Sequence, residues 1–256
     1  MHLRVLRRAQ RARSLLGLAF DYWRILPNLN SHLTLAEKSS ALRRYLQCRR
    51  ALLSMPEIYQ PITIPGFEDI TPRRACEDRL ALITADMGAP PATVIDIGCQ
   101  IGFFSFDLAK RGFLVRGIDS NSRNIRVARL LSTLPGASRP VFTCLELAPN
   151  TTSLLQPADY VLCLAVFHHI IYYQGLSVAK ELISDLRSKT LQRLYFEIGQ
   201  SNEPIEPWAR YLPDMSPDPL EWISSFLLDG GFREIKLLGK VSTHLSDVPR
   251  YLVAAW

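Results

Sequence analysis

Two aspartates and two glycines are spaced along the chain as in a site that binds a nucleoside. Asp96 lies in the apolar run 94–97, Gly98 and Gly102 bracket the turn behind it, and Asp119 follows 23 residues after Asp96. Glycine at such a turn lets the backbone approach a ligand that a Cβ would obstruct. A carboxylate at the end of the next strand can accept hydrogen bonds from both ribose hydroxyls. This order predicts a strand–turn–helix–strand unit with a nucleoside at its turn.

Gln100, in the middle of the turn between Gly98 and Gly102, distinguishes this turn from that of a dinucleotide site. A dinucleotide turn carries a middle glycine so that pyrophosphate can rest on the helix N-terminus, whereas this chain has Gln100 there. Asp96 would repel pyrophosphate but suits a ligand with an ammonium and a sulfonium group, which indicates S-adenosylmethionine. The pattern resembles motif I of class I methyltransferases, and the resemblance covers about residues 72–256. An ordinary strand–helix turn without a ligand is the alternative.

The resemblance implies a set of donor-binding residues. Asp119 would bind the ribose, and Glu146, just after the expected third strand, can accept a hydrogen bond from the adenine amino group. The expected contacts with S-adenosylmethionine are Asp96, Gly98, Cys99, Gly102, Phe103, Asp119, Asn121, Glu146 and Ala165. Arg73, Arg74 and Arg79, shortly before the first strand, can reach the donor carboxylate or an anionic acceptor. Their alternative role is a solvated helix face.

The alternation of strands and helices continues to the C-terminus. The expected strands are 94–97, 114–118, 141–144, 160–165, 194–198, 234–238 and 251–254, with helices at 103–110, 122–131, 177–187 and 221–228. This order predicts an α/β fold, a Rossmann-like class I methyltransferase with a seven-stranded, mostly parallel sheet and helices on both faces. We expect residues 1–90 to form an N-terminal helical extension and linker, and residues 91–256 to form the S-adenosylmethionine-dependent methyltransferase core.

Two adjacent histidines follow the expected fourth strand, in a segment that we expect to be a loop facing the donor methyl group. His168 or His169 can act as the general base that removes a proton from a sugar hydroxyl, because histidine titrates near neutrality. Glu197, near the end of the fifth strand, can orient one of them or be the base itself. The three side chains can also hold a divalent metal such as Mg²⁺. Core histidines with satisfied hydrogen bonds are the alternative.

A proline-rich insertion at 201–219 follows the fifth strand and contains Trp208, Arg210 and Tyr211. Aromatic rings stack on sugar faces, and an arginine can hold an anionic group. The insertion can therefore contact an acceptor above the donor site, and a rigid surface loop is the alternative.

Several motifs resemble the methyltransferase domain of polymannose O-antigen chain terminators. They are Asp96-Ile-Gly-Cys with Gly-Phe-Phe-Ser, Val166-Phe-His-His-Ile, Glu197 with Glu203-Pro, and Thr243-His-Leu-Ser-Asp-Val-Pro-Arg-Tyr. The resemblance implies a mannose-containing saccharide acceptor. Residues expected near it are Arg73, Trp208, Arg210, Tyr211, His244, Arg250 and Tyr251.

Those relatives also carry a kinase domain, and some methylate a terminal phosphate. No kinase motif follows in this sequence. We therefore expect methylation of a hydroxyl of a mannose-type saccharide in polysaccharide biosynthesis or capping, with a terminal sugar phosphate as the alternative.

The formal net charge of +6 suits an anionic partner, and much of the positive charge lies in the first fifty residues. An RNA methyltransferase would interleave basic and aromatic residues along a surface, so this concentration argues against a nucleic acid acceptor. A third interpretation is an S-adenosylmethionine-binding subunit without transfer activity. His168, His169 and Glu197 argue against it, because such a subunit needs no polar base.

The N-terminal segment 1–26 is basic and has apolar residues at helical spacing, and we expect it to be neither a signal peptide nor a transmembrane span. Such a helix can lie on an anionic membrane, or pack on its own domain or on a second subunit, as in a homodimer. A second helix at 33–53 begins with a capping box of Thr34 and Glu37. The five cysteines are scattered without a C-x-x-C pair, which favours reduced thiols in the cytoplasm.

Overall fold

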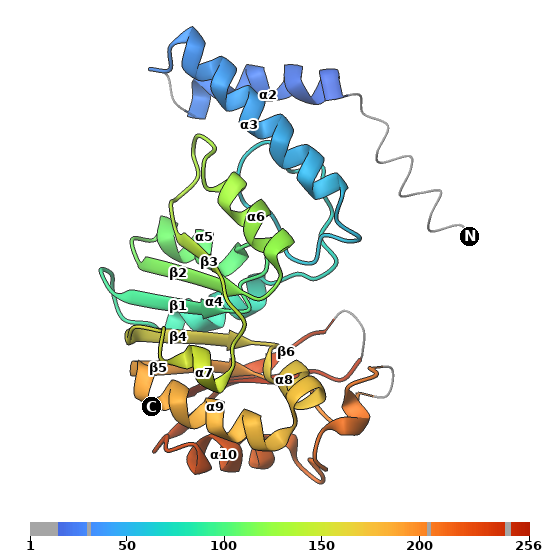
Figure 1. Ribbon diagram of the computed structural model, residues 1–256, viewed down its shortest axis with the longest axis vertical. Coiled ribbons are helices and arrows are strands. Elements are labelled where there is room, and N and C mark those ends of the chain that lie inside the picture. Colours follow the sequence, from blue (N-terminus) through green and yellow to red (C-terminus); the bar gives the residue numbers. More distant parts are fainter. Residues whose placement is uncertain (1–14, 30–31, 204–205, 244–246) are drawn as a thin grey trace, which may run out of the picture.

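A computed structural model describes residues 15–29, 32–203, 206–243 and 247–256, and at its centre is one seven-stranded sheet (Figure 1). The strand order is β3-β2-β1-β4-β5-β7-β6; β1 to β5 run parallel, and β7 is antiparallel to both of its neighbours. The strands are β1 (Thr93–Ile97), β2 (Leu114–Asp119), β3 (Val141–Cys144), β4 (Ala158–Leu164), β5 (Thr190–Glu197), β6 (Ile235–Val241) and β7 (Arg250–Ala255). The predicted mostly parallel sheet is confirmed, with strand ends shifted by a few residues.

Helices cover both faces of the sheet. They are α4 (Glu77–Asp86), α5 (Phe103–Lys110), α6 (Ser122–Leu131), α7 (Pro149–Thr152), α8 (Phe167–Gln174), α9 (Leu176–Lys189) and α10 (Pro219–Asp229), with a 3₁₀ turn η1 (Ala209–Tyr211). Successive strand residues point to opposite faces, so Ile95 and Ile97 pack among α8, α9 and α10 while Val94 packs with α4 and α5. Burial on both faces explains why the central strands are continuous apolar runs.

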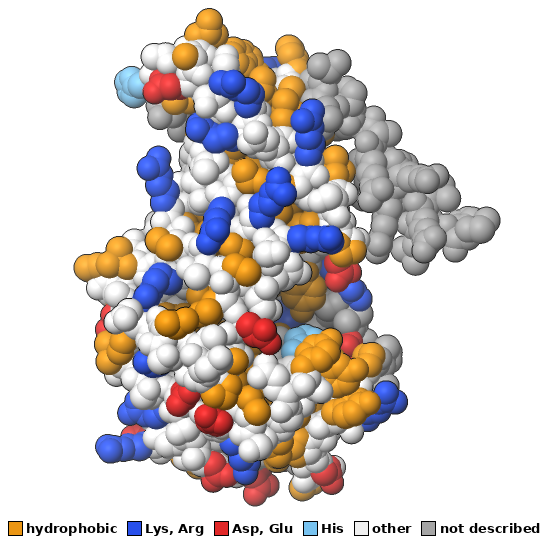
Figure 2. All heavy atoms as spheres, viewed as in Figure 1, with side chains coloured by type: hydrophobic (Ala, Val, Ile, Leu, Met, Phe, Trp, Pro, Cys, Tyr) orange, Lys and Arg blue, Asp and Glu red, His pale blue; other side chains and the backbone are white. Residues whose placement is uncertain are grey.

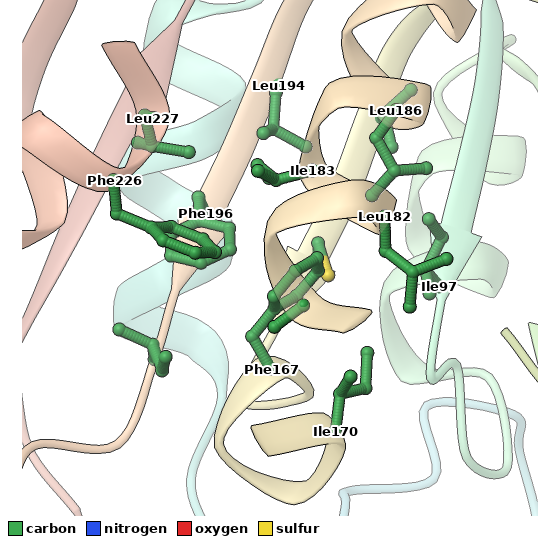
Figure 3. Packing of buried hydrophobic residues seen from close by; sticks show 14 of the residues in the cluster. Ile97, Phe167, Ile170, Leu182, Ile183, Leu186, Leu194, Phe196, Phe226 and Leu227 are labelled. Carbon is green, nitrogen blue, oxygen red and sulfur yellow. The ribbon is translucent and has the colours of Figure 1, made fainter. Parts of the chain in front are cut away.

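The largest core cluster lies between the sheet and α8, α9 and α10. Figure 3 shows Phe167, Phe196 and Phe226 together with leucine and isoleucine side chains of α9 and α10. The ring centroid of Phe167 lies 5.3 Å from that of Phe196 and 5.8 Å from that of Phe226, at edge-on angles that favour aromatic contact. Because Phe167 is the first residue of α8, this packing holds the start of α8 against the end of the sheet.

Helix α8 corrects one prediction, because we expected a loop where the two histidines lie. Strand β4 ends at Leu164, Ala165 turns the chain with a φ of 58°, and a helix then begins at Phe167. Phe167, Ile170 and Ile171 are spaced by three and four residues and are all buried, which is the pattern of an amphipathic helix. The histidines therefore occupy the first turn of a helix.

Two N-terminal helices, α2 (Leu15–Leu29) and α3 (Leu35–Leu53), pack against each other at one end of the molecule (Figure 1). The rings of Tyr22 and Tyr45 stack with centroids 3.9 Å apart, and Leu18 and Leu26 are buried beside them. The predicted capping box is confirmed, since Glu37 N–H donates to Thr34 and Thr34 N–H donates to Glu37. The apolar face of α2 is thus used inside the chain.

Helix α3 packs in turn on α6, which joins the N-terminal helices to the sheet domain. In the described part of the chain, no helix is long and apolar enough to cross a membrane. The predicted helical face before residue 15 lies outside the described residues. The division at residue 90 stays a prediction, although the segment before it contributes to the site below.

Candidate functional site

A cavity of about 640 Å³ opens at the carboxyl ends of β1, β2 and β4. The strand order reverses here, because the chain leaves β1 for β2 on one side and reaches β4 on the other side only after β3. Ligands of open α/β sheets bind at such a reversal. The cavity is lined by residues from the strand ends, from the N-terminal segment 57–79, from α8 and from the 3₁₀ turn region. Its volume is in the range of ligand pockets.

Gly98 lines the cavity at the turn that follows β1. Its φ is 71°, and a Cβ built on it would lie 2.5 Å from Cγ2 of Val166. The N–H groups of Gly98 and Cys99 donate to the carbonyl of Ile118 at 2.8 and 3.0 Å, which ties the turn to β2. The predicted role of Gly98 is supported by this geometry, because any side chain would both strain the turn and fill the cavity.

Asp119 is held in place by backbone hydrogen bonds while lining the cavity. Its Oδ2 accepts from Gln100 N–H at 2.9 Å, and its Oδ1 accepts from Asn121 N–H at 2.8 Å and from Asn124 at 3.3 Å. Burial raises the pKa of Asp119, and these hydrogen bonds oppose that shift. A carboxylate oxygen has further acceptor capacity, so both oxygens can accept from ribose hydroxyls. This part of the cavity fits a nucleoside.

Four of the predicted donor contacts lie behind the turn instead of in the cavity. Asp96 is 3% exposed and accepts a hydrogen bond from Ser105 at 2.6 Å. Burial raises the pKa of Asp96 to about 6, with Ser105 opposing the shift. A carboxylate enclosed in this way supports the turn from below, which corrects its predicted contact with the donor ammonium.

Cys99, Gly102 and Phe103 also lie outside the cavity lining and are buried in the core. A Cβ on Gly102 would lie 2.7 Å from the ring of Phe142, and its φ of 97° already favours glycine. Gly102 is therefore required by packing and by backbone conformation. The prediction of direct ligand contact at these three residues is corrected to a supporting role.

The remaining predicted donor residues do line the cavity. Asn121, Glu146 and Ala165 lie around it, with the apolar side chains Leu145 and Leu147 on either side of Glu146. Apolar walls beside one polar acceptor suit an adenine ring with its exocyclic amino group. The contact of Glu146 with adenine stays a prediction that this placement supports.

Replacing Asp119 by Ala is expected to weaken S-adenosylmethionine binding by about 1–3 kcal/mol, because charge-assisted hydrogen bonds to the ribose are lost. This corresponds to an increase in Kd of about five- to 150-fold, measured by calorimetry. Asp107→Ala is the matched control, since Asp107 pairs with Arg111 on α5 and does not line the cavity. Equal affinities of the two variants would contradict the ribose assignment.

Glu197 is engaged by arginines, which corrects its predicted role as a base or metal ligand. Its side chain is fully buried; Oε1 accepts from Arg74 at 2.7 Å and Oε2 accepts from Arg79 at 2.5 Å. Arg250 Nη1 lies 3.5 Å from Oε1 and also pairs with Glu203, whose two oxygens accept from it at 2.8 Å each. A carboxylate that accepts hydrogen bonds from several guanidinium groups is held in a fixed orientation. Glu197 therefore positions the arginines.

The arginine cluster at the cavity wall has a hydrogen-bond donor that no group in the described part of the chain uses and that an anion could accept from. Arg74, Arg79 and Arg250 line the cavity and are opposed by two buried carboxylates, those of Glu197 and Glu203. Arg74 is 5% exposed, and its Nε has no hydrogen-bond partner within the described residues. Buried donors are almost always satisfied, so this orphan favours an anionic group bound beside it. The alternative of a solvated helix face is wrong for Arg74 and Arg79.

The two histidines occupy different environments. His168 is 2% exposed, its Nδ1 accepts from Gly199 N–H at 3.1 Å, and its ring lies 4.3 Å from that of Trp208. Because Nδ1 is the acceptor, the proton of the neutral ring is on Nε2. Burial lowers the pKa of His168 well below its usual value, with His169 adding to the shift. Protonation of the buried His168 ring is therefore unfavourable, and the ring is held in place by Gly199 and Trp208.

His169 is exposed and lines the cavity beside His168, with the two ring centroids 4.2 Å apart. Partial desolvation, followed by the charge of Arg250, lowers the pKa of His169 from its usual value. Its ring is therefore neutral at pH 7 and can accept a proton from a ligand. Of the two histidines, the geometry favours His169 as the general base.

The predicted metal set is not assembled, because both oxygens of Glu197 face arginines. More generally, residues 15–29, 32–203, 206–243 and 247–256 contain no group of three His, Cys, Asp or Glu side chains able to hold a metal ion.

The insertion after β5 contributes one of its three predicted residues to the cavity. Trp208 is 6% exposed and lines the wall, and a Cβ on Gly199 would lie 2.2 Å from its ring. Arg210 and Tyr211 lie outside the cavity, where the guanidinium sits 5.0 Å from the Tyr211 ring and that ring lies 4.9 Å from Tyr172. Their predicted acceptor contact is therefore corrected.

Of the C-terminal motif, Arg250 lines the cavity and Tyr251 does not. The two are neighbours in β7, whose successive side chains point to opposite faces, and Tyr251 lies beneath Lys240 at 4.8 Å. His244 lies outside the described residues. Arg73 lines the rim and pairs with Glu57.

Several cavity residues had no predicted role, among them Tyr59, Gln60, Asn124 and Tyr173. Tyr59 and Gln60 lie in a proline-rich segment that reads as a linker, and Gln60 accepts from Phe103 N–H at 3.3 Å. Asn124 is three residues after Asn121 and shares its helical face, so helical spacing is the signal from which it could have been predicted. Tyr173 lies on α8, which we had not predicted.

The fold and this site define the chain as a class I methyltransferase, the class that uses S-adenosylmethionine as its methyl donor. No protein-family model matches the chain. Magnesium protoporphyrin IX methyltransferase from Synechocystis, solved with bound S-adenosylmethionine, superimposes with a TM-score of 0.52 at 20% identity, covering 98% of this chain and 95% of that one. This likeness shows the shared fold.

A closer relationship is seen with the O-antigen chain terminator bifunctional methyltransferase/kinase WbdD of Escherichia coli. It is 34% identical over 209 residues, which cover 78% of this chain and 28% of WbdD. A crystal structure of WbdD superimposes with a TM-score of 0.70 at 32% identity, covering 81% of this chain and 47% of that chain. A ubiquinone biosynthesis O-methyltransferase of Leptothrix cholodnii is 35% identical over 79 residues, which cover 30% of this chain and 33% of that enzyme. The chain thus spans less than half the length of these relatives.

Proposed function

We propose that this chain transfers a methyl group from S-adenosylmethionine to an oxygen of a mannose-type saccharide in polysaccharide biosynthesis or capping. The observation that carries the proposal is one cavity that combines two sets of lining residues. Gly98 and Asp119 fit the donor nucleoside, while His169, Trp208 and Arg250 supply a polar and aromatic part of the lining. The relationship to a named O-antigen chain terminator supports a saccharide acceptor.

The bound donor would supply a methyl group on a positively charged sulfur. Asp119 holds the ribose, and Trp208 offers a ring to the face of a sugar. His169 accepts the proton that a sugar hydroxyl loses as its oxygen attacks. Positioning the hydroxyl near the methyl group contributes most of the remaining acceleration, because displacement at carbon requires close, in-line approach. A hydroxyl acceptor is the form of the reaction that uses every one of these residues.

A terminal sugar phosphate is the second candidate acceptor, and one observation favours it. Arg74 keeps an unsatisfied Nε at the cavity, beside Arg79 and Arg250. A phosphate oxygen is already ionised, so it needs arginines to hold it and no base to activate it. The donor carboxylate is the competing use of the same arginines. The two acceptors differ in whether His169 is required.

Methyl transfer from radiolabelled S-adenosylmethionine distinguishes these functions. We expect incorporation into oligomannosides, weaker incorporation into phosphomannosides and none into bulk RNA. Transfer to phosphomannosides alone would replace the hydroxyl acceptor by the phosphate. Transfer to RNA alone would overturn the saccharide proposal, and donor binding without transfer to any acceptor would favour a non-catalytic subunit.

The proposal includes a cytoplasmic enzyme that forms a homodimer. All five cysteines are free thiols, four of them buried, as suits a reducing compartment. Equilibrium sedimentation would measure the oligomeric state directly.

A further inference from the structure

A second concave site lies between α3 and α6, separate from the donor cavity. It has a volume of about 530 Å³ and is lined by one face of each helix. The α3 face consists of Gln47, Arg50, Ala51 and Ser54, which recur at helical spacing. The α6 face presents Arg123 and Arg126 in the same way. Because α6 also carries Asn121 and Asn124 at its start, its first turn is the wall between the two sites.

Three arginines at this groove have no anionic partner. Arg50, Arg123 and Arg126 are exposed and line the groove, and no acidic residue lines it with them. In the described part of the chain, no ion pair joins any of the three to a carboxylate. Three cations that line one groove without counter-charges repel one another, so an anion bound among them would relieve that repulsion.

The floor of the groove is apolar and the surrounding surface is basic. Met55 and Val127 are buried at its base, and Leu53, three residues after Arg50, is 46% exposed on α3. Figure 2 shows Lys and Arg side chains gathered over the end of the molecule where Figure 1 places α2, α3 and α6, while Asp and Glu gather toward the opposite end. The groove thus combines cations with apolar side chains within an extended positive surface.

We propose that this groove binds the phosphate groups of anionic membrane lipids, so that the α3–α6 face rests on a negatively charged bilayer surface. Lipid phosphates match the three guanidinium groups, and the apolar floor with Leu53 matches the region just beneath the headgroups. Nucleic acid is the less suitable occupant, because no aromatic residue lines the groove for base stacking. This site is independent of the methyl acceptor and would hold the enzyme at a membrane surface.

The test uses the full chain and vesicles of phosphatidylcholine with or without one quarter phosphatidylglycerol. We expect co-sedimentation with the anionic vesicles, weakening as ionic strength increases. The triple substitution R50Q/R123Q/R126Q should lower the partition coefficient about a hundredfold, since each basic residue near the surface contributes about fivefold. The charge-conserving triple R50K/R123K/R126K should bind close to the parent.

A matched control removes three positive charges elsewhere, in K110Q/K189Q/R233Q, and should bind the vesicles nearly as the parent does. Unchanged donor affinity and unfolding temperature in all three variants keep the comparison valid for folded protein. The proposal is overturned if the groove triple binds anionic vesicles like the parent, as it would if the basic N-terminal residues alone held the protein there. Equal binding to pure phosphatidylcholine, an equal loss in the control triple, or tighter binding of a single-stranded RNA than of the vesicles would also overturn it.

Discussion

Glu197→Gln is expected to lower the free energy of unfolding by about 3–5 kcal/mol, because it removes the charge that two buried arginines share. Arg74 is 5% exposed and Arg79 is 1% exposed, and both donate to this one carboxylate. An amide at position 197 keeps the shape but offers one acceptor oxygen and turns an NH₂ group toward a guanidinium. Both guanidinium groups are almost fully buried, so they regain little hydration when the charge is lost.

Thermal unfolding measures this effect, and a loss of this size corresponds to a decrease in Tm of about 10 °C for a chain of this length. Glu57→Gln is the control, because Glu57 also pairs with an arginine of the same segment, Arg73, but with side chains 36% and 39% exposed. Exposed pairs contribute about 0–1 kcal/mol, so its Tm should stay close to the parent. Similar shifts in the two variants would mean that the buried cluster is not a stabilising centre.

His169→Ala is expected to lower kcat on a mannoside acceptor by about 10²–10⁴-fold while donor affinity stays near the parental value. The loss is confined to kcat because the side chain acts on the proton of the acceptor and not on the ribose that Asp119 binds. His32→Ala is a suitable control, since His32 lies between α2 and α3 and does not line the cavity.

The pH profile separates a base from a residue that only shapes the cavity. A base works in its neutral form, so activity should increase as pH rises through the pKa of His169. Desolvation and Arg250 lower the pKa of His169 from its usual value of 6.5, so the midpoint of the increase should lie below pH 6.5, and the increase should be absent from the His169 variant. If the His169 variant keeps both rate and profile while His168→Ala loses them, the base is His168. If neither histidine affects the rate, the acceptor needs no base, as expected for a phosphate.

Local sequence determined the methyltransferase fold and the donor end of the site. The run from Thr93 to Asp119 contains a strand, a glycine turn, a helix and an acid. Their order predicts the fold of this unit without any knowledge of contacts to distant parts of the chain. Gly98 and Asp119 lie within one such unit, and their positions follow from strand geometry. The capping box at Thr34 was equally readable, because its hydrogen bonds join residues three apart.

Only the tertiary structure shows which of the predicted acidic and basic site residues are free to contact a ligand. Glu197 looked like a free acid at a strand end, but Arg74 and Arg79, more than a hundred residues earlier in the chain, occupy both of its oxygens. Asp96 was predicted to contact the ligand, but its side chain points from β1 toward α5 and accepts a hydrogen bond from Ser105. His168 and His169 are adjacent in sequence and both line the cavity, yet the first turn of α8 buries His168 beside Trp208 and leaves His169 exposed. Periodicity shows which side chains share a face of one element, whereas burial and ionic partners depend on contacts between elements remote in sequence, and those contacts decide which acid or base is free to act.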